Sequence, residues 1–325
     1  MERNLYFDFL RGIAIIMVVA IHTYTITNDV GTIALRQILN CAVPLFLAVS
    51  GYFMACKDCS SSEKYTYFIK KQVTRVYLPC LLWSIPQFAL LYYLGQMTVE
   101  NAVFLFVGGY FGFYFIILII QYYLLLPILQ SWMSNKGLAL SLVISLLSVA
   151  TLTYLMQIRG ISIPLVIYAG GFPLWLVFFY LGMYLRKCSE REYKVAPVIL
   201  LVLVAFILQV IETRYLMTFN GGGVGIKPSS FLFSFCIILV TFSKKMEDLF
   251  ERCKKLLYPV VIIGNYSFGI YLAHCYFIYL LSIYFPYDGY GTWAINTIIA
   301  LLLCLATIVI LRKIVNKRYW KIIGC

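Results

Sequence analysis

Long apolar runs recur along the whole sequence, and they limit what the chain can fold into. One bilayer crossing needs about 20 mostly apolar helical residues. Nine runs have this character: 9–28, 37–56, 74–94, 138–157, 170–186, 195–216, 228–243, 258–284 and 293–312. We expect Phe111 to Ser131 to form one further crossing and Val99 to Val107 a short interfacial or re-entrant piece. The sequence therefore predicts an all-α polytopic transmembrane helical bundle of about ten helices, with residues 1–325 as a single domain.

The composition supports this fold class. Hydrophobic residues make up 62% of the chain and charged residues only 12%, whereas a soluble domain carries roughly 25% charged residues. No compact core can absorb so much apolar surface, so much of it must face lipid. The first 28 residues resemble a signal peptide, but no small-residue cleavage site follows them, and we expect a retained first helix.

The positive charges predict an orientation. If both termini lie in the cytoplasm, all but four of the 26 Lys and Arg residues fall on the cytoplasmic side; the four exceptions are Arg36, Arg159, Arg214 and Lys227. This asymmetry follows the positive-inside rule. It predicts a multi-pass protein of the cell (inner, cytoplasmic) membrane, and it explains the net charge of +13 without a nucleic-acid partner.

Ionisable residues inside membrane spans are costly and often functional. Both histidines of the chain, His22 and His274, fall within predicted helices. Arg11 precedes His22 by 11 residues, which places both on one face of the first helix, about 16 Å apart along its axis. We therefore expect a polar stripe that runs from a cation near the cytoplasm to an imidazole in the outer half of the membrane.

The helix predicted over 258–284 carries a second polar face. Ser267, Tyr271 and His274 have the spacing i, i+4, i+7, which brings them to one side of a helix. Either histidine alone is also compatible with a buried imidazole that hydrogen-bonds a neighbouring helix. A neutral histidine in a cleft can accept a proton at physiological pH, and two such faces in one chain favour the functional interpretation.

Two other features have less specific meanings. Arg75 opens the predicted third helix, where it either follows the positive-inside rule or contacts a phosphate at the cytoplasmic mouth together with Arg11. Cys56 and Cys59 have the spacing of half a zinc site, but no second pair complements them, so we predict no metal.

Five segments in the same order resemble the acyltransferase 3 family. They are RNLYFDFLRGIAIIMVVAIHTY with its Arg-x10-His pattern at Arg11 and His22, VPLFLAVSGYF (43–53), QYYLLLP (121–127), YLGMYL (180–185) and GNYSFGIYLAH (264–274). Two departures concern the donor side. Gln72 stands where many members have the first Arg of Arg-x-x-Arg, and GFYF (112–115) replaces a His-Leu-Trp-Phe-like stretch.

The resemblance implies a ten-helix membrane enzyme that takes an acyl group, commonly acetyl, from cytoplasmic acyl-CoA. The acceptor is a carbohydrate hydroxyl at the opposite face, such as that of a surface polysaccharide or its lipid-linked precursor. In this hypothesis Arg11 and Arg75 hold the CoA phosphates, and His22 is the general base or a transient acyl carrier. His274 orients His22, accepts the proton or binds the acceptor. Ser267, Tyr271 and Ser50 contact the acceptor or support the catalytic groups.

A secondary transporter of a small polar solute such as an amino acid is the alternative. Intramembrane charges and broken helices also mark transport pathways, and the family resemblance extends to membrane domains suggested to move amino acids. The sequence shows no inverted repeat and few acidic residues within its spans, which favours the enzyme.

Overall fold

The computed structural model describes residues 4–24, 29–108, 112–187, 192–220, 222–286 and 289–324. Within these ranges every regular element is a helix and no strand occurs. The elements are α1 (Leu5–His22), α2 (Val30–Ile38), η1 (Leu39–Cys41), α3 (Ala42–Met54), α4 (Ser62–Tyr93), α5 (Val99–Phe106), α6 (Tyr114–Ser131), α7 (Asn135–Thr153), η2 (Tyr154–Ile158), α8 (Leu165–Tyr168), α9 (Phe172–Lys187), α10 (Val195–Asn220), α11 (Pro228–Phe242), α12 (Lys244–Asn265), α13 (Ser267–Tyr284), α14 (Tyr290–Ile314) and η3 (Lys317–Tyr319).

The membrane bundle predicted from the apolar runs is confirmed. Nine helical stretches in the described part of the chain are long and apolar enough to cross a bilayer, and a tenth results if the pair α11–α12, bent by 62°, forms one span. The piece expected at Val99 to Val107 is the short helix α5, which is not one of these spans. The cytoplasmic location of the termini stays a prediction.

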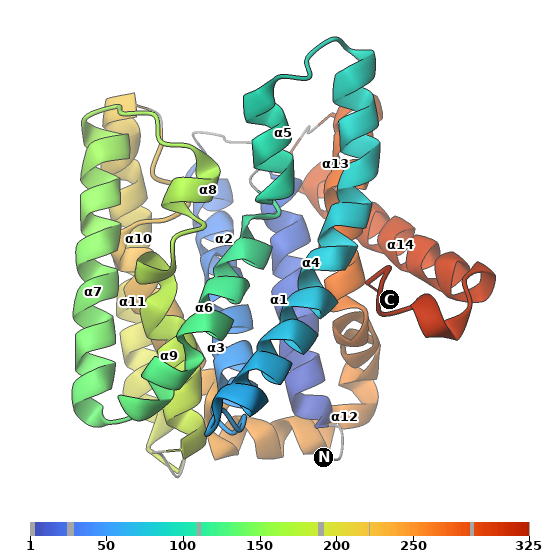
Figure 1. Ribbon diagram of the computed structural model, residues 1–325. Coiled ribbons are helices and arrows are strands. Elements are labelled where there is room, and N and C mark those ends of the chain that lie inside the picture. The colour runs from blue at the N-terminus through green and yellow to red at the C-terminus, as the bar shows by residue number, and fades with distance from the viewer. Residues whose placement is uncertain are drawn as a thin grey trace.

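Helix α10 illustrates why this fold requires a bilayer. Leu200, Leu203, Ile207 and Ile211 repeat at helical spacing on one face, and all four side chains are exposed. In Figure 1 α10 and α7 lie together at one edge of the bundle, away from α1. A continuous aliphatic face of this kind is unfavourable in water, whereas lipid tails solvate it.

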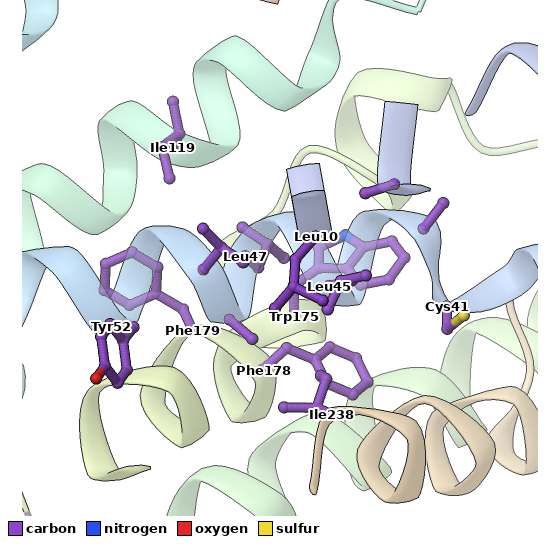
Figure 2. Close-up of a cluster of buried hydrophobic side chains, with 14 of the residues drawn as sticks. Leu10, Cys41, Leu45, Leu47, Tyr52, Ile119, Trp175, Phe178, Phe179 and Ile238 are labelled. Carbon is purple, nitrogen blue, oxygen red and sulfur yellow. The ribbon is translucent and has the colours of Figure 1, made fainter. Parts of the chain in front are cut away.

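Helices α3 and α9 approach each other so closely that their contact requires glycine. A Cβ atom at Gly51 would lie 2.0 Å from the carbonyl oxygen of Phe179, and one at Gly182 would lie 1.9 Å from that of Ala48. Figure 2 shows side chains of both helices, Phe179 and Leu45 among them, in one apolar cluster. Small residues at such contacts are typical of helix packing in membranes.

Glycine also permits close packing at α1, the helix that carries two of the predicted site residues. A Cβ atom at Gly12 would lie 2.1 Å from the carbonyl oxygen of Val260, and one at Gly264 would lie 1.8 Å from that of Asp8. Glycines on both helices thus allow α12 to pack directly against the backbone of α1.

The predicted start of the third helix is wrong. Helix α4 begins at Ser62 instead of residue 74, because the side chain of Ser61 caps it by accepting a 3.2 Å hydrogen bond from the amide of Lys64. Glu63 in the first turn also favours this start. Arg75 therefore lies in the interior of a long helix and not at its beginning.

The single helix predicted over 258–284 is also wrong. Helix α12 ends at Asn265, and α13 begins at Ser267 after a break at Tyr266. Glycine and asparagine are weak helix formers, and Gly264 with Asn265 immediately precedes the break. Ser267, Tyr271 and His274, the three polar residues predicted to share a face, all lie in α13.

Two other predicted helices have different limits. The first was expected over 9–28, but Asn4 caps α1 four residues earlier and its last residue is His22. The second, expected over 37–56, is the broken stretch α2–η1–α3, with Pro44 near the start of α3. Proline lacks an amide hydrogen and is tolerated in a first turn.

Candidate functional site

A cavity of about 370 Å³ inside the bundle brings together most of the predicted site residues. Its lining includes five of the seven residues singled out from the sequence: Arg11, His22, Ser50, Ser267 and Tyr271. Helices α1, α3 and α13 supply these five residues, and α2, η1, α4, α6, α8, α9 and α11 also contribute to the mostly apolar wall. The size is that of a small-ligand site.

The two histidines lie next to each other. Their ring centroids are 5.2 Å apart, with 54° between the ring planes. His22, the last residue of α1, faces the cavity and has an accessible side chain. The side chain of His274 is only 1% exposed and does not belong to the cavity lining. His22 is therefore placed to meet a ligand, and His274 is placed to act through His22.

The hydrogen bond of His274 indicates its tautomer. Its Nδ1 lies 2.5 Å from the backbone oxygen of Tyr271. A carbonyl oxygen can only accept, so in the neutral ring Nδ1 carries the hydrogen and Nε2 keeps its lone pair. The Sγ of Cys275 lies 3.5 Å from Nε2. These contacts fix the ring next to His22.

Arg11 enters the cavity from the second turn of α1. Its Nη1 donates to Oδ1 of Asp8 at 3.0 Å, and its guanidinium lies 5.0 Å from the ring centre of Phe53. Asp8 is 4% exposed. The cation at this end of the cavity is thus already paired with a buried carboxylate.

Arg75 does not line the cavity, unlike its neighbour Val76. Its side chain is exposed on α4. Tyr123, a cavity residue on α6, lies within the electrostatic reach of both Arg75 and Arg11. Arg75 therefore lies near the same wall of the cavity as Arg11, but on the side of that wall that faces away from the cavity.

The hydroxyl residues occupy different parts of the lining. Ser50 comes from α3, whereas Ser267 and Tyr271 come from the first turns of α13. The hydroxyl of Tyr271 donates to the backbone oxygen of Gly112 at 2.8 Å, which ties α13 to the segment before α6. Tyr271 therefore helps to shape the cavity.

The sequence interpretation missed a polar group in the lining. Arg36 of α2 and Asn40 of η1 line the cavity, and Nη1 of Arg36 donates to Oδ1 of Asn40 at 2.6 Å. Arg36 is 8% exposed and lies close enough to His22 for their charges to interact. The only signal in the sequence was the i, i+4 spacing of Arg36, which was placed on the outer side, and Asn40, which lies at the start of the helix predicted over 37–56.

An aspartate cap fixes the helix that carries Arg36. Oδ2 of Asp29 accepts hydrogen bonds of 2.6 Å from both the amide and the hydroxyl of Thr32, and a third bond from the hydroxyl of Tyr290 in α14. The hydrogen bonds from Thr32 and Tyr290 lower the pKa of Asp29 to about 2. The cap therefore stays ionised at physiological pH and holds α2 against α14.

Comparisons with known proteins agree on the class. The sequence model of the acyltransferase 3 family, described as an acyltransferase domain, matches residues 4–313. The chain is 28% identical over 200 residues to a Bacillus subtilis (strain 168) protein named "Putative membrane-bound acyltransferase YfiQ". That alignment covers 56% of this chain and 52% of the relative, so the chain spans about half the length of the curated relative that it matches. No solved structure matches the chain.

Proposed function

We propose that this chain, which belongs to the acyltransferase 3 family, is a membrane acyltransferase that transfers an acetyl group from acyl-CoA to a carbohydrate hydroxyl outside the cytoplasm. The observation that carries this proposal is the single cavity that contains both Arg11 and His22. The two residues stand about 16 Å apart along α1, so a donor and an acceptor can approach one reaction centre from opposite ends.

The donor end is the one with Arg11. A guanidinium suits phosphate recognition because it presents several donors in a fixed plane. In the proposal Arg11 contacts the CoA phosphates from inside the cavity. Arg75 contacts them from the side of the same wall that faces away from the cavity. The pantetheine arm, which is long and thin, then places the thioester beside His22.

The reaction at His22 is an ordinary acyl transfer. The acceptor oxygen attacks the thioester carbonyl carbon while His22 removes the hydroxyl proton. The tetrahedral intermediate then loses the CoA thiolate as the C–S bond breaks, and His22 returns the proton to sulfur. General-base catalysis of this kind contributes about 10²–10⁴-fold.

His274 acts as a positioning residue in this scheme. Its ring lies beside His22 but outside the cavity, and its Nδ1 is held by the backbone oxygen of Tyr271. It therefore limits the orientations of His22 without touching either substrate.

Acyl transfer in isolated membranes tests the proposal. Membranes that contain the wild-type protein, with total surface glycan as acceptor, should incorporate label from radiolabelled acetyl-CoA. The His22→Ala variant should lose about 10²-fold or more of this rate. Thr307→Ala is the matched control, because Thr307 lies on α14 outside the cavity lining and its hydroxyl donates to the backbone oxygen of Leu303 in the same helix.

The outcome also separates the enzyme from a carrier. Normal transfer by a folded His22→Ala protein would remove His22 from the mechanism. Absence of transfer by the wild type with several acyl donors would contradict the proposed reaction, and uptake of a polar solute without acyl-CoA would then favour transport.

A further inference from the structure

A second buried basic residue lies close to Arg36, the cavity residue whose charge acts on His22. Lys227, at the start of α11, is 0% exposed and interacts electrostatically with Arg36. Its Nζ donates to Oε1 of Gln37 at 2.5 Å and lies 3.4 Å from the backbone oxygen of Gly225, which lines the cavity. Two basic side chains therefore meet at one wall.

The hydrogen-bonding partners of this basic pair are neutral. Asn40 accepts from Arg36, Gln37 accepts from Lys227, and Nδ2 of Asn40 donates to Oε1 of Gln37 at 2.8 Å. In the part of the chain that the structure describes, neither cation forms an ion pair with a carboxylate.

Glu212 is an acidic residue whose charge acts on Lys227, but its carboxylate is hydrogen-bonded to Ser229. Oε2 of Glu212 accepts from the backbone amide of Ser229 at 2.9 Å and also from its hydroxyl. Glu212 affects Lys227 through space but does not form a salt bridge with it.

Buried cations without a counter-charge are unfavourable. Amide oxygens satisfy their hydrogens only in part, and removing a charge from water costs several kcal/mol unless an opposite charge compensates for it. Arg36 remains protonated in any such environment, and it is the member of the pair that reaches the cavity. An anion bound there would gain charge-assisted hydrogen bonds to a prepared guanidinium.

We propose that the acceptor carries an anionic group, a carboxylate or a phosphate, which Arg36 holds while a neighbouring hydroxyl reaches His22. The proposal rests on the proposed acyl transfer and assigns the chemical class of its acceptor. We assign Arg36 to the acceptor and not to the donor because it lies near His22. Arg11, which is assigned to the donor, lies about three turns of α1 away from His22.

Ligand-induced stabilisation tests the site independently of catalysis. The thermal unfolding of the detergent-solubilised chain is measured at constant ionic strength with three soluble probes. Methyl glucuronide carries a carboxylate, glucose 1-phosphate carries a phosphate, and methyl glucoside is their neutral counterpart. We expect a charged probe to bind about tenfold more tightly than the neutral one, and the stronger of the two charged probes identifies the anion.

Variants assign the effect to Arg36. Arg36→Gln removes the charge and should abolish the preference for a charged probe, whereas Arg36→Lys should keep part of it. Arg159→Gln is the matched control, since it makes the same charge change at an exposed residue outside the cavity lining. If Arg36→Gln does not fold, comparison of the three probes with the wild type and Arg36→Lys still decides the question.

The results separate this proposal from the proposed function. Equal binding of charged and neutral probes by the wild type, or an unchanged preference in folded Arg36→Gln, would overturn the anion site even if acyl transfer occurs. Charge-selective binding that depends on Arg36, in a protein without transferase activity, would support the site and contradict the reaction.

Discussion

Replacement of Gly264 by alanine tests whether α1 is held by direct backbone contact with α12. The added Cβ atom would lie 1.8 Å from the carbonyl oxygen of Asp8 and 2.8 Å from the amide nitrogen of Gly12. An ordinary contact begins at 3.4 Å, so the helices must separate by about 1.6 Å at this point. Overpacking typically costs about 1–3 kcal/mol, and a clash with backbone, which cannot rotate away, should cost at least about 3 kcal/mol.

The midpoint of unfolding in detergent measures this loss. Gly291→Ala is the matched control, because a Cβ atom at Gly291 meets nothing within 4 Å. A free-energy difference of about 3 kcal/mol corresponds to roughly 100-fold in the unfolding equilibrium. Equal stability of the Gly264→Ala and Gly291→Ala proteins would refute the close packing of α1 against α12.

A double variant provides a further check on the geometry. Gly12→Ala would place a Cβ atom 2.1 Å from the carbonyl oxygen of Val260, across the same pair of helices. Once one substitution has separated the helices, the second needs little additional movement. The loss of unfolding free energy in the Gly12→Ala/Gly264→Ala protein should therefore be smaller than the sum of the losses in the two single variants. Strict additivity would indicate two independent contacts.

Three further substitutions address the site. His274→Ala removes a ring that packs on His22 and bonds the backbone of Tyr271, so kcat should fall about tenfold while the KM for acyl-CoA stays unchanged; a raised KM would place His274 in substrate binding. Arg11→Lys should lower kcat/KM for acyl-CoA more than Arg75→Lys, because both variants keep the charge and, of the two residues, only Arg11 lines the cavity. Steady-state kinetics at a fixed acceptor concentration measure this difference. The reverse order would assign the donor phosphates to Arg75.

The sequence was sufficient where a single helix carried the information. The face shared by Arg11 and His22 depends only on 11 residues of regular helix, and both residues line one cavity. Ser267 and Tyr271, from the face predicted on α13, also line the cavity, whereas His274, the third member of that predicted face, does not. The contact between the two histidines joins α1 to α13, and no periodicity within one helix specifies which helices become neighbours.

Helix limits were less predictable, because hydropathy does not register polar caps. Ser61 caps α4 well before its apolar part begins. Arg75 therefore lies in the middle of this helix, with an exposed side chain, and not at its start. Asn4 likewise starts α1 earlier and makes His22 its last residue.

Arg36 was assigned to an outer loop because the positive-inside rule treats basic residues as markers of orientation. The rule contains no term for a basic residue inside a span, yet α2 continues through η1 into α3 as one helical stretch, Val30–Met54, and Arg36 of α2 lines the cavity. Burial of Lys227 depends on contacts with Gln37, which is 190 positions away in the sequence. Only the tertiary structure could place Arg36 near His22 and Lys227 near Arg36.

The two cationic ends of the cavity differ in net charge, and this difference gives the proposed reaction a direction. Arg11 is paired with the buried Asp8, so it adds little net charge to the cavity lining, and Arg75 lies outside that lining. Arg36 is bonded only to the neutral Asn40 among the described residues, so the end near His22 is positive. An anionic acceptor is therefore drawn to His22 and not towards the donor end. A donor held at Arg11 meets a balanced ion pair, which favours moderate affinity and release of CoA after transfer.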